Sequence, residues 1–105
     1  MSNLSDEQKS RIAGYLGLAQ KAGRIVAGDQ MVKEALLKNR LHLLVLADDV
    51  AETVRRELTA LAAERNVAIL TLASKDQLGL IVGKSRRGAL GLLDSGFAAA
   101  IAKII

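Results

Sequence analysis

Leu41–Ala47 reads LHLLVLA, a run of seven residues in which only His42 is polar. Charged residues bound the run, with Arg40 before it and Asp48 after it. Its shortness and its aliphatic content are typical of a strand that is buried on both faces of a sheet. We therefore expect Leu41–Ala47 to be a strand that other elements cover on both sides.

Three further apolar runs are candidate strands. Val67–Leu72 (VAILTL) has the same buried character, Gly88–Leu93 (GALGLL) is weakened by Gly91, and Ile25–Ala27 is short. The stretches around these runs have apolar residues at helical spacing, which predicts helices. The predicted helices cover residues 5–22, 29–39, 50–65, 74–82 and 96–104.

Helices and strands alternate along the whole chain, which begins and ends with a helix. Such alternation predicts right-handed crossovers and a central sheet with helices on both faces. The expected fold class is therefore α/β, a three-layer α/β/α sandwich with a four-stranded central sheet. The direction of each strand stays open. Since 105 residues is near the usual domain size, we expect residues 1–105 to form a single domain.

Local patterns predict helix caps and buried helix faces. Ser5 with Gln8 and Ser74 with Gln77 match the capping box, in which each side chain bonds the other residue's backbone N–H group. Asp49 is interpreted as the cap of helix 50–65. Ser95 is expected to cap the last helix, and the predicted buried residues include Met31, Val32, Ala35, Leu36, Leu80, Ile81, Val82, Phe97, Ala98, Ile101 and Ile105.

The composition excludes several classes of functional site. The chain has no Cys and a single His, so a disulfide scaffold, a thiolate zinc site, an iron–sulfur cluster, a Cys nucleophile and a His-based metal cluster are all excluded. We expect neither a metal nor a cofactor. The net charge of +4 favours an anionic partner, such as nucleic acid or an acidic membrane surface.

Charged residues interrupt every long apolar stretch. The longest stretches without one have nine residues, at positions 12–20 and 66–74. A transmembrane helix needs about 20 apolar residues, so we expect none. The first residues are charged and no long apolar region follows them, which is unlike a secretory signal. We therefore expect a cytoplasmic protein.

Three patterns could indicate other chemistry. Gly79–Ser85 resembles a phosphate-binding P-loop, but three residues separate its glycines where the motif has four, and a helix is predicted before it. His42 could be a general base, yet no nucleophile-elbow motif accompanies it. Asp48 and Asp49 could bind a metal or act as an acid–base pair, but we interpret them as a helix cap. We therefore predict no catalytic residue.

Positive charge is concentrated in two parts of the chain. Residues 1–47 and 67–105 each carry a net charge of +3, whereas residues 48–66 carry −2. A helix N-terminus offers free N–H groups to a phosphate, and neighbouring cations repel one another unless an anion approaches. The two clusters are Lys21, Arg24 and Lys33 around Gly28, and Lys84, Arg86 and Arg87 in the loop before the last strand.

Asp29, Gln30 and Lys33 are spaced so that their side chains share one side of the first two helical turns. A carboxylate, an amide and an ammonium group can bond the edges of guanine. An ordinary solvated helix start, with an Asp29–Lys33 ion pair, would explain the same spacing.

Four motifs together carry a family resemblance: residues 18–24 (LAQKAGR), 28–35 (GDQMVKEA), 43–49 (LLVLADD) and 78–84 (LGLIVGK). With them, residues 10–102 resemble the kink-turn RNA-binding ribosomal proteins, the L-seven-Ae and L-thirty-e superfamily. Residues 83–86 (GKSR) and 94–98 (DSGFA) are most similar to its bacterial YlxQ-type branch.

The resemblance implies RNA binding at a sharply bent helix–internal-loop–helix element. In the family, a Gly followed by Asn-Glu-x-x-Lys contacts the guanines of tandem sheared G·A pairs, and Gly28, Asp29, Gln30 and Lys33 fall on those positions. A second contact falls on residues 84–87. Asp29 and Gln30 depart from the family's Asn and Glu, and the second loop is basic where it is often apolar. Both changes favour phosphate binding over base reading.

The sequence therefore predicts a non-enzymatic, monomeric protein that binds structured RNA, such as ribosomal RNA, in a ribosome or another ribonucleoprotein. One alternative is a protein-interaction module that uses the last helix and Ile104-Ile105. Another is an enzyme that binds a phosphorylated small molecule at Gly83–Arg87. The predicted RNA-binding residues are Lys21, Arg24, Gly28, Asp29, Gln30, Lys33, Lys84, Arg86 and Arg87.

Overall fold

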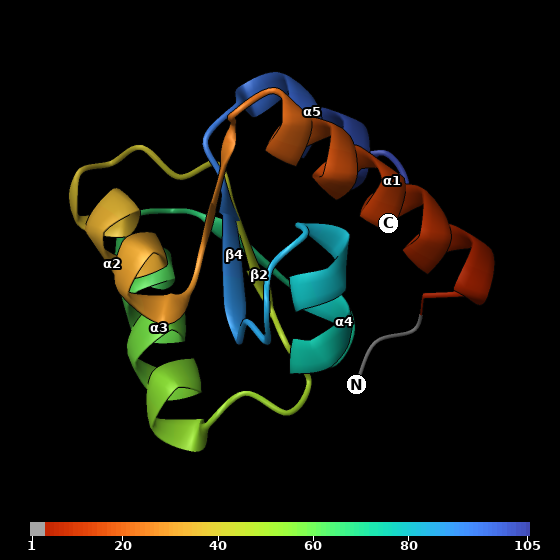
Figure 1. The fold of residues 1–105 in the computed structure, drawn as a ribbon. Coiled ribbons are helices and arrows are strands. Elements are labelled where there is room, and N and C mark those ends of the chain that lie inside the picture. The colour runs from red at the N-terminus through yellow and green to blue at the C-terminus, as the bar shows by residue number, and fades with distance from the viewer. Residues whose placement is uncertain (1–3) are drawn as a thin grey trace.

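The computed structural model describes residues 4–105, in which five helices alternate with four strands (Figure 1). Residues 1–3 of the predicted domain lie outside this part of the chain. The elements are α1 (Asp6–Lys21), β1 (Ile25–Ala27), α2 (Asp29–Leu37), β2 (Leu43–Leu46), α3 (Glu52–Glu64), β3 (Ala68–Thr71), α4 (Lys75–Ile81), β4 (Ala89–Leu92) and α5 (Ser95–Ala102).

The strands form one sheet in the order β1-β4-β2-β3. β4 is antiparallel to both of its neighbours, whereas β2 and β3 are parallel. Leu92, at the end of β4, therefore lies between the starts of β1 and β2, and Ala89 lies where β2 ends. The sheet thus has two ends along the direction of its strands, which we call the Leu92 end and the Ala89 end.

Apolar clusters fill the space on both faces of the sheet. Helices α1, α4 and α5 cover one face, and α2 and α3 cover the other (Figure 1). β2 contributes to both clusters, with Leu43 and Val45 on the first face and Leu44 and Leu46 on the second. The three-layer sandwich with a four-stranded sheet is confirmed, and β2 is buried throughout.

β3 is less buried than its apolar sequence predicts. It is an edge strand, in which Ala68 is exposed and the side chain of Ile69 is 39% exposed. The prediction that Val67–Leu72 is buried on both faces is therefore wrong. As an edge strand, β3 has a neighbouring strand on one side only, and part of it stays in contact with solvent.

Both predicted capping boxes are confirmed. At the start of α1, Gln8 N donates to Ser5 Oγ over 3.1 Å, and Ser5 N donates to Gln8 Oε1 over 2.8 Å. Ser74 and Gln77 form the same pair of bonds at the start of α4. In both boxes the two residues are three apart in sequence, so the local pattern is enough to predict where these helices start.

Two other predicted caps are wrong. The backbone N–H of Lys75 donates to Asp49 Oδ1 over 2.8 Å, so Asp49 stabilises the start of α4 and α3 begins without a side-chain cap. α5 is capped by Asp94 rather than Ser95, because Asp94 Oδ1 accepts a hydrogen bond from Phe97 N over 3.0 Å. The sequence pattern assigns Asp49 to α3 and the α5 cap to Ser95. In the structure Asp49 bonds the start of α4, and Asp94 caps α5.

Three side chains that the sequence predicts to be buried are exposed. Met31 is 50% exposed, Leu80 is 78% exposed and Ile105 is 63% exposed. Ile104 is buried instead of Ile105, and its carbonyl oxygen accepts a hydrogen bond from Gln8 Nε2 over 2.8 Å. A hydrogen bond therefore joins residue 104 to the first turn of α1.

Gly91 has a packing role in β4. A Cβ atom added at Gly91 would collide with Leu41 Cδ1 and lie 3.2 Å from Leu41 Cγ. Both residues are buried. Glycine therefore lets Leu41 pack directly on the central strand.

Candidate functional site

The start of α2 lies at the Ala89 end of the sheet. Gly28 precedes the helix with a φ of 103°, a conformation that favours glycine, and its N–H donates to Ala89 O over 2.8 Å. Asp29 and Gln30 follow and are exposed. The first helical turn thus presents its partial positive charge to solvent.

The loop between α4 and β4 is fixed by its backbone. Gly83 leaves α4 with a φ of 69°, Lys84 N donates to Gly79 O over 2.8 Å, and Arg87 N donates to Lys75 O over 3.1 Å. These contacts hold the cations of the loop on a defined backbone.

The Arg87 side chain joins this loop to the start of α2. A Cβ atom added at Gly28 would lie 3.9 Å from Arg87 Cδ, so the arginine passes over the glycine in van der Waals contact. Two of the predicted basic segments, far apart in sequence, are therefore adjacent. We call residues 28–30, Lys33 and residues 84–87 the α2–loop surface.

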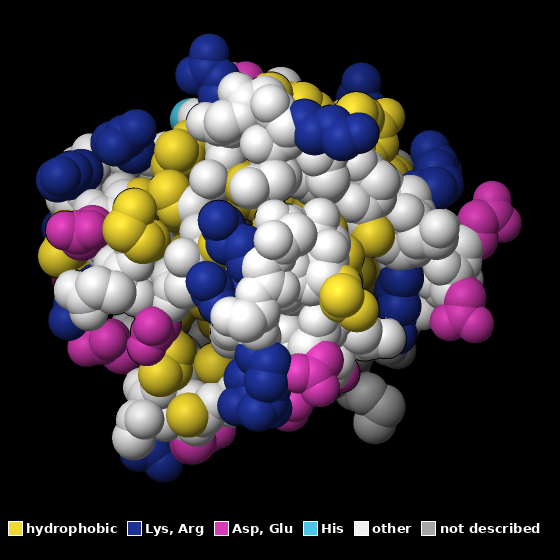
Figure 2. Space-filling model, in the orientation of Figure 1, with side chains coloured by type: hydrophobic (Ala, Val, Ile, Leu, Met, Phe, Trp, Pro, Cys, Tyr) yellow, Lys and Arg dark blue, Asp and Glu magenta, His cyan; other side chains and the backbone are white. Residues whose placement is uncertain are grey.

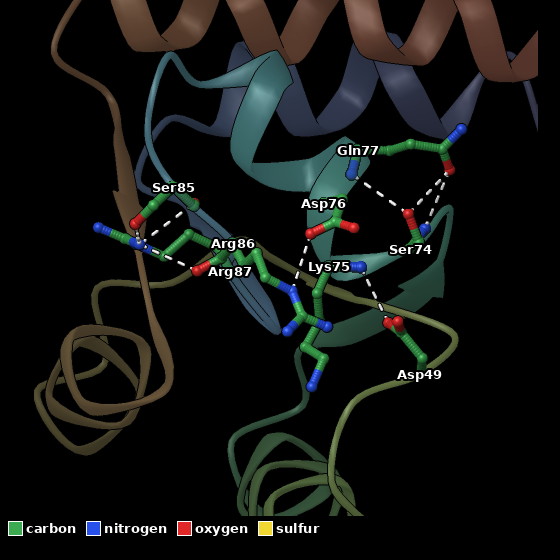
Figure 3. Close-up of polar contacts among 8 residues, drawn as sticks. All are labelled: Asp49, Ser74, Lys75, Asp76, Gln77, Ser85, Arg86 and Arg87. Carbon is green, nitrogen blue, oxygen red and sulfur yellow. Dashed lines mark hydrogen bonds and ion pairs between the residues drawn. The ribbon is translucent and has the colours of Figure 1, made fainter.

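The cations of the loop differ in their partners. Arg87 Nη1 donates to Ser85 Oγ over 2.8 Å and to Arg86 O over 2.9 Å, both within its own loop (Figure 3). Arg86 Nε lies 2.8 Å from Asp76 Oδ1, in an ion pair whose side chains are 62% and 71% exposed. Because exposed ion pairs contribute only about 0–1 kcal/mol, an incoming anion can compete for Arg86.

Lys84 is exposed, and no carboxylate among residues 4–105 forms an ion pair with it. Figure 2 shows dark-blue side chains in the middle of this face, between the region of α2 and that of α4. The loop is therefore a local concentration of positive charge with few neutralising partners.

Lys75 belongs to the same neighbourhood, although the sequence analysis did not select it. Its Cδ would lie 3.9 Å from a Cβ added at Gly88, and its carbonyl oxygen accepts a hydrogen bond from Arg87 N. The sequence indicates only that Lys75 follows the capping residue of a helix. Its nearness to the loop depends on how α4 packs beside β4.

Lys33 is paired across two helices. Its Nζ lies 3.2 Å from Glu57 Oε2 on α3, with side chains 38% and 55% exposed. The Asp29–Lys33 pair that the helical spacing suggests does not form. Instead, Asp29 Oδ1 accepts a hydrogen bond from Gln30 N over 3.0 Å.

Lys21 and Arg24 do not join the α2–loop surface. The carbonyl oxygen of Arg24 accepts a hydrogen bond from Leu93 N over 2.9 Å, which places Arg24 at the Leu92 end of the sheet. The three residues of β1 lie between it and Gly28, so the two are four steps and about 13 Å apart at 3.3 Å per residue. The predicted cluster around Gly28 is therefore divided in space.

The other candidate chemistry finds little support in residues 4–105. No group of three His, Cys, Asp or Glu side chains there could hold a metal ion. Gly79 lies within α4 and Gly83 follows it, so the P-loop-like segment ends a helix and leads into a strand, the reverse of a P-loop. Within the same residues, no helix combines the length and the apolar character that crossing a membrane requires.

Comparisons with known proteins agree with this architecture. The model of the ribosomal protein L7Ae/L30e/S12e/Gadd45 family matches residues 10–101. A solved structure described as "a protein with unknown function from Bacillus halodurans C" superposes with a TM-score of 0.84 at 24% identity, covering 89% of this chain and 94% of that one. At that identity the superposition shows the fold alone.

Two curated relatives are named RNA-binding protein YlxQ. The protein from Enterococcus faecium is 21% identical over 95 residues, which cover 90% of this chain and 91% of the relative. The protein from Bacillus subtilis (strain 168) is 29% identical over 83 residues, which cover 79% and 83%. With the family match over residues 10–101, these similarities show that the chain belongs to the ribosomal protein L7Ae/L30e/S12e/Gadd45 family and to its YlxQ-type branch.

Proposed function

We propose that this chain is a non-enzymatic RNA-binding protein that recognises structured, kink-turn-like RNA. Two similar proteins of the family are named for RNA binding. The observation that carries the proposal is the contact between Arg87 and Gly28, which joins a helix start and a basic loop into one surface. In this proposal the protein is a monomer in the cytoplasm. It binds a folded RNA through this surface, as part of a ribosome or another ribonucleoprotein.

Phosphate contacts contribute most of the affinity in this proposal. Lys84, Arg86 and Arg87 lie on a loop whose backbone is held at both ends, so they approach an RNA backbone with little further ordering. The α2 start adds backbone N–H donors and its partial charge. Contacts of this kind position an RNA without reading its sequence.

Base reading falls to Asp29, Gln30 and Lys33 at the exposed start of α2. Lys33 supplies donors once Glu57 releases it, and Gln30 supplies both donors and acceptors. An ionised Asp29 only accepts, and one of its oxygens already bonds Gln30 N. We therefore expect the protein to distinguish guanine from other bases only weakly, and phosphate contacts to supply most of the binding free energy.

Asp29→Asn combined with Gln30→Glu tests the proposed base contacts. Asn restores a donor at position 29, and Glu is a stronger acceptor for guanine N1–H and N2–H, while the net charge of the two positions is unchanged. One improved base contact corresponds to roughly a tenfold gain, or about 1.4 kcal/mol. The measurement is the ratio of Kd values for a kink-turn RNA and an unbent duplex at one salt concentration.

The wild-type protein and the exchange Glu34→Gln, which removes a charge farther along α2, are the controls. If the ratio rises in the double variant alone, α2 reads the bent RNA. An unchanged ratio would mean that these positions do not contact bases. Failure of the wild type to bind any of the RNAs, even at low salt, would reject RNA binding itself.

A further inference from the structure

The Leu92 end of the sheet carries a second group of cations, which the α2–loop surface does not include. We define the distal basic surface as Lys21, Arg24, Lys38 and Arg40. We propose that this surface binds the phosphates of a second RNA segment, so that one chain holds two segments of the same RNA at opposite ends of its sheet. The inference rests on the proposed function of RNA binding.

Strand pairing brings the members of this surface together. Leu92 pairs with Ile25 of β1 on one side and with Leu43 of β2 on the other. Arg24 precedes β1 directly, and His42, just before β2, donates its N–H to Leu92 O over 2.8 Å. Since neighbouring strands lie about 4.8 Å apart, the starts of β1 and β2 are separated by about 10 Å.

The turn between α2 and β2 presents the other two cations. Asn39 has a φ of 56°, and Arg40 N donates to Ala35 O over 2.9 Å, which ends the helix sharply. Arg65 Nη1 donates to Asn39 Oδ1 over 3.0 Å from the end of α3. Lys38 and Arg40 therefore flank a residue that is held in place, and Arg65 adds a further positive charge behind them.

Few acids face the distal basic surface. All four of its side chains are exposed, and none forms an ion pair with a carboxylate of residues 4–105. Asp94 follows Leu92 by two residues, but its Oδ1 accepts a hydrogen bond from Phe97 N at the start of α5. Glu34 lies one helical turn before Lys38 without an ion pair, and Glu64 precedes Arg65. Cations gathered in this way favour an anion.

The two basic surfaces are well separated. From Gly88 to Leu93 the chain advances five residues along β4, which is about 16 Å at 3.3 Å per residue. That distance exceeds the Debye length of about 8 Å at physiological ionic strength, so the cations of the loop are screened from those at the Leu92 end. Lys33 lies nearer, because Lys38 ends the same helix and five helical residues span about 7.5 Å. In Figure 2, dark-blue side chains at the upper left and the top are separated by neutral and hydrophobic surface from those in the middle.

An RNA fits this arrangement better than an acidic membrane does. Under the proposed function an RNA already occupies the α2–loop surface, so an arm of that same RNA is the anion nearest to the distal basic surface. A bent RNA has two arms that leave the bend in different directions, and it can reach both ends.

The test compares two RNAs that share the same bent element, one minimal and one with longer arms. Arg24, Lys38 and Arg40 are all changed to Gln, and the matched control changes Lys9, Arg11 and Lys103 to Gln. Circular dichroism and thermal melting establish that both triple variants fold. Affinity for each RNA is then measured over a range of salt concentrations.

We expect the distal variant to bind the minimal RNA within about twofold of the wild type, because the cations of the loop are screened from those at the Leu92 end. Its binding of the extended RNA should fall at least about tenfold, with a salt slope less steep by about 2 to 3, since three phosphate contacts are lost. The control variant should bind both RNAs nearly as the wild type does.

Several results would overturn the inference. If the distal variant loses the same affinity for both RNAs, its residues belong to one continuous site with the α2–loop surface. If the control variant loses as much affinity as the distal variant, the effect comes from net charge alone. Unchanged binding of the extended RNA would remove the surface from RNA recognition. If vesicles containing phosphatidylserine bind the wild type but not the distal variant, while RNA binding is unchanged, the partner is a membrane. A wild type that binds neither RNA would overturn the proposed function as well.

Discussion

Changing Lys84, Arg86 and Arg87 together to Gln is expected to weaken binding of a minimal kink-turn RNA about a hundredfold at physiological salt, or about 2.7 kcal/mol. Each cation that meets a phosphate releases a counterion, and the three lie within four residues of one loop. The contacts of Arg87 with its own loop and the exposed pair of Arg86 leave these charges available to an anion.

The salt dependence separates this effect from misfolding. If about four cations of the wild type meet phosphates, log K against log salt should have a slope of about −3 to −4, and the triple variant should lose about 2 to 3 of it. The variant with Lys9, Arg11 and Lys103 changed to Gln carries the same net charge and should keep the slope. Equal slopes in the two triple variants would place the phosphate contacts elsewhere.

Replacing Gly79 by Ala is expected to destabilise the protein by about 2–3 kcal/mol and to lower Tm by roughly 10–20 °C. Gly79 is buried in α4 where the loop crosses the helix. A Cβ there would collide with the carbonyl group of Ser85 and lie 2.9 Å from Lys84 O. These neighbours are backbone atoms, so they cannot move aside as a flexible side chain does.

Gly14→Ala is the matched control for this prediction. Gly14 lies in α1, is exposed, and would place its Cβ in open space. The exchange should therefore stabilise the protein by about 0.5–1 kcal/mol, since alanine is the better helix former. Thermal melting of both variants decides the matter. If Gly79→Ala melts at or above the wild-type Tm, the loop is not packed against α4 in this way.

The same exchange links packing to the proposed site. Lys84 N donates to Gly79 O over 2.8 Å, and residues 84 and 85 are the ones that a larger side chain would displace. At a temperature where Gly79→Ala remains folded, its RNA affinity should therefore fall as well, whereas Gly14→Ala should bind as the wild type does.

The parts of the fold that depend on neighbouring residues could be predicted from the sequence. The capping boxes at Ser5 and Ser74 involve residues three apart, and both form. β2 is a run of aliphatic residues that is buried on both faces, as its pattern indicates. The alternation of helices and strands predicts the three layers, and the order of the elements is as expected.

The parts that depend on strand order could not be predicted. Nothing in Val67–Leu72 distinguishes a central strand from an edge strand, because both have the same apolar pattern. Asp49 caps α4 rather than α3, since β2 and β3 are neighbours and bring their following loops together. A carboxylate accepts from whichever N–H group is nearest in space.

For the candidate site, too, the sequence predicts the residues but not their arrangement in space. The residues themselves, Gly28 to Lys33 and Lys84 to Arg87, stand out in the sequence by charge and by family motif. Their adjacency follows from β4 lying beside β1, which the sequence leaves open. The separation of Arg24 from Gly28 follows from the extended strand β1 between them, and the nearness of Lys75 to the loop follows from the packing of α4 beside β4.

Backbone amide NMR of the wild-type protein, titrated with a minimal kink-turn RNA, tests most directly whether α2 and the loop form one RNA surface. The account predicts that the amides of residues 28–33 and 84–88 shift together and saturate at the same RNA concentration. Amides of β3 and of the second half of α5 should stay in place. Shifts confined to another face, or shifts in only one of the two segments, would contradict it.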